Sequence, residues 1–218
     1  MLPTDPIHPL KDVWLRPRRV FRELAARRVG LADCLLVSAQ GIGNFLALYR
    51  TQDAGAHESV ALILAHSIAY GAVAGIASVW LMAFIYQRLG ARAGGRSTIG
   101  QVIHVLAYGG APMVASLAIW VLTALLAGED TFLHTPRAGL EAFLGLLLHM
   151  QFISYVFLLI WSIVLQVMGL SEVHGLTTRR AFGVWVLGQL IGLLASLFLA
   201  VAIQVLFPGI LLRFIPQR

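Results

Sequence analysis

The stretch HVLAYGGAP, which starts at His104, combines side chains that can do chemistry with residues that weaken a helix. His104 and Tyr108 stand four residues apart, so a helix would place both on one face. Gly109, Gly110 and Pro112 follow within an apolar segment, where two glycines and a proline predict a kink. The stretch therefore predicts a site, a packing seam between helices, or a hinge.

Ionisable side chains within apolar segments are costly in a membrane and indicate function by default. Besides His104 they are Asp33, His66, Glu141 and His149. Asp33 and His104 lie at a similar predicted depth and can form a pair, and His66 can meet His149 in the opposite half. A proton relay needs carboxylates across the midplane, and a metal needs clustered ligands. We therefore interpret these groups as interhelical hydrogen-bonding groups and the His104 stretch as a kinked packing seam.

Common enzyme signatures do not occur in the sequence. It contains no HExxH, GxSxG, P-loop or GxGxxG motif, and its single cysteine, Cys34, has no partner for a disulfide or a metal. An intramembrane protease would need a nucleophile with a base or two aspartates, and only Asp33 lies near an apolar segment. We expect a non-enzymatic protein without a cofactor or a metal.

Composition indicates a membrane protein. The chain of 218 residues is 59% hydrophobic and only 12% charged, about half the charged fraction of soluble domains. Its apolar runs are long and unbroken, which favours spanning helices over the alternating pattern of a β-barrel. The net charge of +6 comes from basic residues beside these runs, so we exclude nucleic acid as a partner.

The runs predict an all-α polytopic fold with five transmembrane helices in one bundle. We expect an N-terminal segment at 1–30, a membrane domain at 31–210 and a short tail at 211–218. About 20 residues cross the hydrocarbon core, and each predicted span is near or above that length. The predicted spans are 31–48, 59–86, 99–127, 138–168 and 181–206.

The basic residues also predict the orientation of the chain. With five spans, twelve Lys and Arg residues fall on one side of the membrane and four on the other. The positive-inside rule then places the N-terminus in the cytoplasm and the C-terminus in the periplasm. The high ratio of arginine to lysine, with Lys11 as the only lysine, hints at a bacterial source and hence the inner membrane.

The segment WLRPRRVFRELAARR predicts an amphipathic helix before the first span. Pro17 suits the first helical position, and apolar residues from Val20 to Ala25 share one face. We expect this helix to lie on the cytoplasmic membrane surface and meet anionic lipids, with docking of a soluble partner as the alternative. Its basic face consists of Arg18, Arg19, Arg22 and Arg27.

Small residues predict close helix packing. Gly71 and Gly75 have the GxxxG spacing in the second span, and Gly188 and Gly192 repeat it in the fifth. We expect these faces to be used within the chain, with a dimer as the alternative. Before the third span, Thr98 and Gln101 match the capping box that starts a helix, and Thr177 or Thr178 can cap the fifth.

Three stretches and the topology resemble the Yip1 domain family in its short bacterial form. The stretches are WLRPRRVFREL, GQVIHVLAYGGAPM and WSIVLQVMGLSEVHGLTTRRAF, and the likeness covers most of the chain. The resemblance implies a five-helix bundle with no known catalytic residues. Eukaryotic members act in vesicle traffic with small prenylated GTPases and reticulon-like proteins. A bacterium lacks that machinery, so we do not carry this role over.

These observations favour a non-enzymatic membrane scaffold or accessory subunit that binds a membrane protein or a second copy of itself, or that organises the bilayer. The alternative is a small transporter or channel that uses the intramembrane His, Asp and Gln residues at the kinked third span. A third hypothesis is lipid recognition by the N-terminal arginines.

Overall fold

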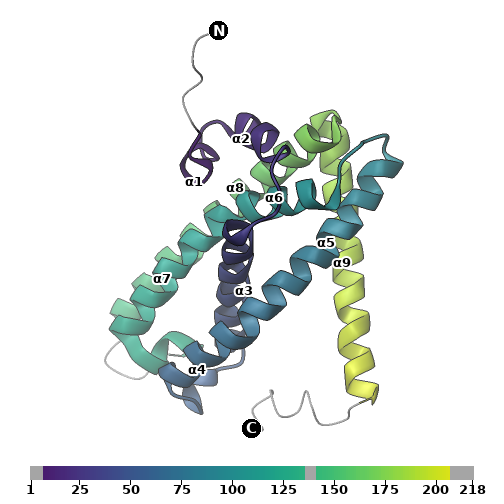
Figure 1. Cartoon of the computed structure of the whole chain (residues 1–218). Helices are drawn as coiled ribbons and strands as arrows, with labels where there is room; N and C mark the ends of the chain where they lie inside the picture. Colours follow the sequence, from purple (N-terminus) through teal and green to yellow (C-terminus); the bar gives the residue numbers. More distant parts are fainter. Residues whose placement is uncertain (1–6, 136–140, 207–218) are drawn as a thin grey trace.

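The apolar segments form helices because hydrocarbon requires every backbone N–H and C=O to be bonded within its own segment. The computed structural model describes residues 7–135 and 141–206, and these residues form helices and no strands. Within them, five segments are long and apolar enough to cross a membrane, so the protein is an all-α polytopic membrane protein (Figure 1). These segments are Leu31–Thr51, Val60–Arg92, Ile99–Phe132, Gly145–His174 and Thr178–Leu199.

Three of the spans are continuous helices and two are interrupted. The continuous ones are α3 (Leu31–Thr51), α8 (Glu141–His174) and α9 (Thr178–Leu206). The second span comprises α4 (Val60–His66), a π-helical turn (Ser67–Gly71) and α5 (Ala72–Arg92). The third comprises α6 (Ile99–Gly109) and α7 (Ala111–Ala127). The predicted tail at 211–218 and the predicted start of the fourth span at 138–140 lie outside the described residues.

The shorter elements lie at the ends of the spans. They are α1 (Pro9–Asp12), α2 (Pro17–Leu24) and the 3₁₀ turns Ala54–Ala56 and Gly128–Phe132. Two predicted caps are confirmed. Gln101 N donates to Thr98 Oγ1 at 3.3 Å while Thr98 N donates to Gln101 Oε1 at 3.0 Å, and Arg180 N donates to Thr177 Oγ1 at 3.4 Å.

Helix α8 continues to His174, beyond the predicted span end at Met168. Leu170 and Ser171 are buried in this extension, and Glu172 is bonded to Arg22 of α2. Contacts with other parts of the protein therefore stabilise the extension of α8 beyond Met168, which burial in lipid alone does not require.

Helix α3 lies within the bundle and packs against α5, α6 and α7 (Figure 1). Its contact with the second span depends on glycines, because a Cβ on Gly41 would lie 2.7 Å from the Cα of Gly75. A Cβ on Gly71 would lie 2.8 Å from the Cα of Ile42. The predicted Gly71–Gly75 face is thus used inside the chain, where it lets two backbones touch.

Helix α9 packs along α5 and α8. A Cβ on Gly188 would lie 2.6 Å from Cδ1 of the Tyr86 ring, and one on Gly192 would lie 2.7 Å from the sulfur of Met82. The second predicted glycine face therefore also meets a helix of the same chain.

The apolar face of α2 differs from the sequence expectation. Val20, Phe21 and Leu24 are at most 2% exposed, because α2 packs against α6 and α8. The face that was expected to enter the lipid interface is thus covered by protein. Helix α2 ends at Leu24, so Arg27 belongs to the segment that follows the helix.

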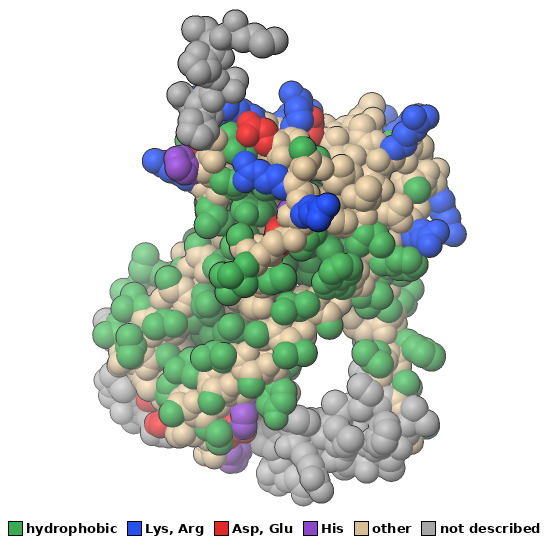
Figure 2. Space-filling view, viewed as in Figure 1, with side chains coloured by type: hydrophobic (Ala, Val, Ile, Leu, Met, Phe, Trp, Pro, Cys, Tyr) green, Lys and Arg blue, Asp and Glu red, His purple; other side chains and the backbone are tan. Residues whose placement is uncertain are grey.

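Charged side chains mark one end of the molecule. Figure 2 shows Lys and Arg side chains gathered where α1 and α2 lie, whereas hydrophobic side chains cover most of the rest of this face. We call this the arginine end. The positive-inside rule assigns it to the cytoplasm, which stays a prediction.

Candidate functional site

The HVLAYGGAP stretch forms the break in the third span. Gly110, with φ −85° and ψ −3°, separates α6 from α7. Pro112 lies in the first turn of α7, where backbone N–H groups have no acceptor within the helix. The N–H group that proline lacks therefore costs α7 no hydrogen bond. The two half-helices therefore meet at Gly110, and neither has a proline in its interior.

A break in a helix frees carbonyl groups, which hydrocarbon cannot satisfy. At the end of α6, side chains from two neighbouring helices donate hydrogen bonds to the freed carbonyl groups. Gln40 of α3 donates from Nε2 to the Ala107 carbonyl at 3.1 Å, and Ser162 of α8 donates from Oγ to the Gly109 carbonyl at 2.8 Å. The break is thus closed by polar groups of the same protein.

The glycines of the motif make room for these side chains. A Cβ on Gly110 would lie 2.6 Å from Nε2 of Gln40, and a Cβ on Gly109 would lie 2.8 Å from Cγ of Gln166. Gln166 also donates to Ser162 Oγ at 3.3 Å and accepts from Trp185 Nε1 of α9 at 3.0 Å. A chain of hydrogen bonds therefore runs from the break to the fifth span.

His104 and Asp33 form a buried pair, with His104 six residues before the break at Gly110. His104 Nδ1 lies 2.6 Å from Asp33 Oδ1, and the two residues are 2% and 4% exposed. His104 Nε2 lies 3.3 Å from the Arg27 carbonyl. Because an acceptor faces each ring nitrogen, the geometry suits a doubly protonated imidazole beside a carboxylate. Asp33 also accepts from Gly30 N at 2.9 Å, which caps α3.

Further bonds tie the N-terminal segment to the spans. Gln101 Nε2 of α6 donates to the Ala25 carbonyl at 3.0 Å. Arg22 Nε donates to Glu172 Oε1 at 2.8 Å, and this bond raises the pKa of the Arg22 guanidinium. Arg18 donates to Thr178 Oγ1 of α9 at 3.1 Å. Two members of the predicted basic face, Arg18 and Arg22, thus bond to the long helices α9 and α8.

The remaining sequence candidates lie elsewhere. Tyr108 is buried beside the break, at 6% exposure. His66 lies 3.6 Å from Glu58 at the opposite end of the second span, and its ring stacks on Tyr49. His149 Nδ1 bonds to the Gly145 carbonyl of its own helix at 2.6 Å. The side chain of Glu141 is outside the described part of the structure.

Two parts of the network were not predicted from the sequence. Ser162 and Gln166 lie in the fourth span, and a hydroxyl and an amide in an apolar helix were the signal that could have found them. The second part is the pair of Ser97 and His174, whose Oγ and Nε2 atoms lie 3.1 Å apart at the arginine end. His174 packs on Gly90 and Gly95 there.

The arrangement binds helices together, and its central polar groups are buried. His104, Asp33 and Ser162 are all at most 4% exposed. Among the described residues, no group of three or more His, Cys, Asp or Glu side chains could hold a metal ion. The side chains bonded at the break, Gln40, Ser162 and Gln166, and the buried pair of Asp33 and His104 instead join the helices, and we call these five residues the polar seam. The N-terminal segment is bonded to the polar seam through the Arg27 carbonyl.

Fold and seam define a helical membrane protein whose intramembrane polar groups join its own helices. The Yip1 domain model matches residues 11–201, and the chain belongs to this family. The comparisons with curated proteins and with solved structures find no significant match.

Proposed function

We propose that the protein is a non-enzymatic scaffold or accessory subunit of the bacterial inner membrane, which presents its arginine end to a membrane-protein partner or a second copy. The observation that carries this proposal is the attachment of the N-terminal segment to the polar seam. Through the Ala25 and Arg27 carbonyls and the Arg22 side chain, the segment is bonded to α6 and α8, so the backbone that carries its arginines is held against the bundle.

A fixed basic surface can recognise a partner with less entropy loss than a loose tail. Arg27 and Arg28 are exposed beside the buried pair, and Arg18 and Arg22 are exposed on α2. Because the apolar face of α2 is used within the protein, binding at this surface would rest on charge. Acidic segments of a partner and anionic lipid headgroups at the cytoplasmic face both fit that chemistry.

Co-purification from native membranes in a mild detergent tests the proposal. The full-length protein should recover a reproducible partner or self-associate. The R27Q/R28Q variant should lose most of the recovered partner or most of the self-association. The control is R88Q. It removes an arginine whose Cζ atom lies 5.1 Å from the centroid of the Phe84 ring. A protein that is a solitary monomer in every preparation would contradict the proposal.

The transporter alternative rests on the break in the third span. Gln40, Ser162 and Gln166 occupy the space at this break, which favours a structural role. Flux of protons, metal ions or small solutes in liposomes, reduced by His104→Ala, would favour the alternative instead.

A further inference from the structure

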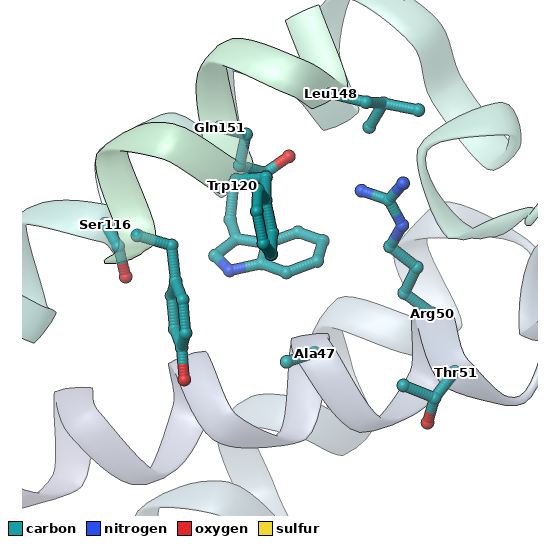
Figure 3. A pocket seen from close by; sticks show the side chains of 9 residues that line it. Ala47, Arg50, Thr51, Ser116, Trp120, Leu148 and Gln151 are labelled. Atoms are coloured by element: carbon teal, nitrogen blue, oxygen red, sulfur yellow. The ribbon is translucent and has the colours of Figure 1, made fainter. Parts of the chain in front are cut away.

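A pocket of about 240 Å³ lies between α3, α7 and α8, at the end of the bundle opposite the arginine end (Figure 3). This volume is smaller than sites for whole drug-sized ligands, so it suits a headgroup or a small ion. Polar and apolar side chains share its wall. The residues that matter here are Arg50, Ser116, Trp120, Leu148, Gln151 and Phe152.

Arg50 supplies a positive charge to this pocket. It lies in the last turn of α3 and is partly buried, and Figure 3 shows its guanidinium extending toward Leu148 of α8. Within the described residues, no ion pair or hydrogen bond engages this guanidinium. A cation beside hydrocarbon is costly without a counter-charge, so the position calls for an anion.

Gln151 supplies an independent indication of a ligand. It is 7% exposed, and its buried Oε1 atom has no hydrogen-bond partner among the described residues. Figure 3 shows the amide turned toward the same space as Arg50. A buried acceptor without a partner is rare in native structures, because its desolvation is not repaid. A ligand that carries a hydroxyl donor beside its anionic group would satisfy it.

The apolar part of the wall indicates where the rest of the ligand lies. Trp120 is buried at the back of the pocket, while Phe152 is 68% exposed on α8. Exposed apolar side chains of a spanning helix face lipid chains. The pocket thus opens from the bundle toward the hydrocarbon, and an amphiphile can enter it from the membrane.

We infer that this pocket binds the headgroup of an anionic glycerophospholipid with a polyol headgroup. The phosphate bonds to Arg50, a headgroup hydroxyl donates to Gln151 Oε1, and the acyl chains remain in the bilayer beside Phe152. A free phosphate ion shares the anionic part of this chemistry, so the test must separate the two sources. The site is remote from the arginine end, and the inference does not rest on the proposed function.

The test uses delipidated full-length protein in an uncharged detergent. Phosphatidylglycerol, phosphatidylcholine with the same chains, and inorganic phosphate are titrated separately, and binding is followed by native mass spectrometry. We expect phosphatidylglycerol to bind at least about tenfold more tightly than phosphatidylcholine, and inorganic phosphate not to displace it. Equal binding of the two lipids would overturn the inference, and displacement by phosphate alone would reassign the site to a soluble anion.

Variants locate the binding within the pocket. R50Q should weaken phosphatidylglycerol binding about tenfold, R50K should retain most of it, and Q151L should weaken it about threefold or more. R88Q removes the same charge from an exposed arginine at the other end and should stay within about twofold of wild type. If circular dichroism shows that R50Q is unfolded, phosphatidylglycerol binding by R50K and Q151L still tests the assignment. Equal losses in R50Q and R88Q, or no loss in Q151L, would overturn the assignment.

Discussion

The imidazole of His104 and the carboxylate of Asp33 meet at 2.6 Å across the contact between α6 and α3, and both residues are almost fully buried. The second ring nitrogen of His104 faces the Arg27 carbonyl at 3.3 Å. One side chain therefore joins the first span, the third span and the segment that carries the arginines. Removing either partner leaves a buried polar group without its complement.

Asp33→Asn should destabilise the protein by about 3–5 kcal/mol, because it leaves a buried imidazole without its counter-charge. Thermal unfolding of the purified protein in detergent measures the change. Glu23→Gln is the control, since it breaks the partly exposed i,i+4 pair with Arg19 and should cost less than about 1 kcal/mol. Equal melting temperatures for the two variants would show that the buried pair contributes nothing.

Much of this architecture could be predicted from local patterns. Apolar runs locate helices, a capping box starts α6, and GxxxG spacing marks faces that allow close approach, because each depends on residues near one another in sequence. The similar depth of Asp33 and His104, near the same end of their spans, makes a contact between them possible. Depth does not determine which helices are neighbours, so it shows that the two residues could meet but not that they do.

Other features depend on neighbours that no local pattern specifies. The apolar face made by Val20, Phe21 and Leu24 has the same pattern whether it meets lipid or α8. Gln40 and Ser162 reach the carbonyls of the broken helix only because α3 and α8 flank that break. The polar seam and the Arg50 pocket are therefore products of tertiary packing.

Ser162→Ala should cost about 1–3 kcal/mol of stability, because the Gly109 carbonyl freed by the break would lose its buried donor. Ser196→Ala is a matched control, since the Ser196 hydroxyl donates to the Gly192 carbonyl of its own helix at an exposed position. Its expected effect is within about 0.5 kcal/mol. Chemical denaturation in mixed micelles compares the two, and a Ser162→Ala protein as stable as the control would argue against the seam.

Phe21→Ala should release α2 from the spans, because the ring is fully buried against α6 and α8 and its truncation costs about 3–5 kcal/mol. Hydrogen exchange of residues 17–29 should then rise strongly. Arg22→Gln breaks only an exposed bond to Glu172, so exchange there should change little. A larger rise in Arg22→Gln than in Phe21→Ala would mean that charge, not apolar burial, docks the segment.

Gly41 and Gly43 lie two residues apart on α3 and should respond oppositely to alanine. A Cβ on Gly41 would meet the backbone of Gly75, at 2.7 Å from its Cα, which no side-chain rotation can relieve. Gly41→Ala should therefore destabilise the protein by about 1–3 kcal/mol or more. A Cβ on Gly43 meets nothing within 4 Å, so Gly43→Ala should be neutral or stabilise by up to about 1 kcal/mol through helix propensity. Thermal unfolding of the two variants side by side measures the difference, and a Gly41→Ala protein as stable as Gly43→Ala would mean that α3 and the second span do not touch through their backbones.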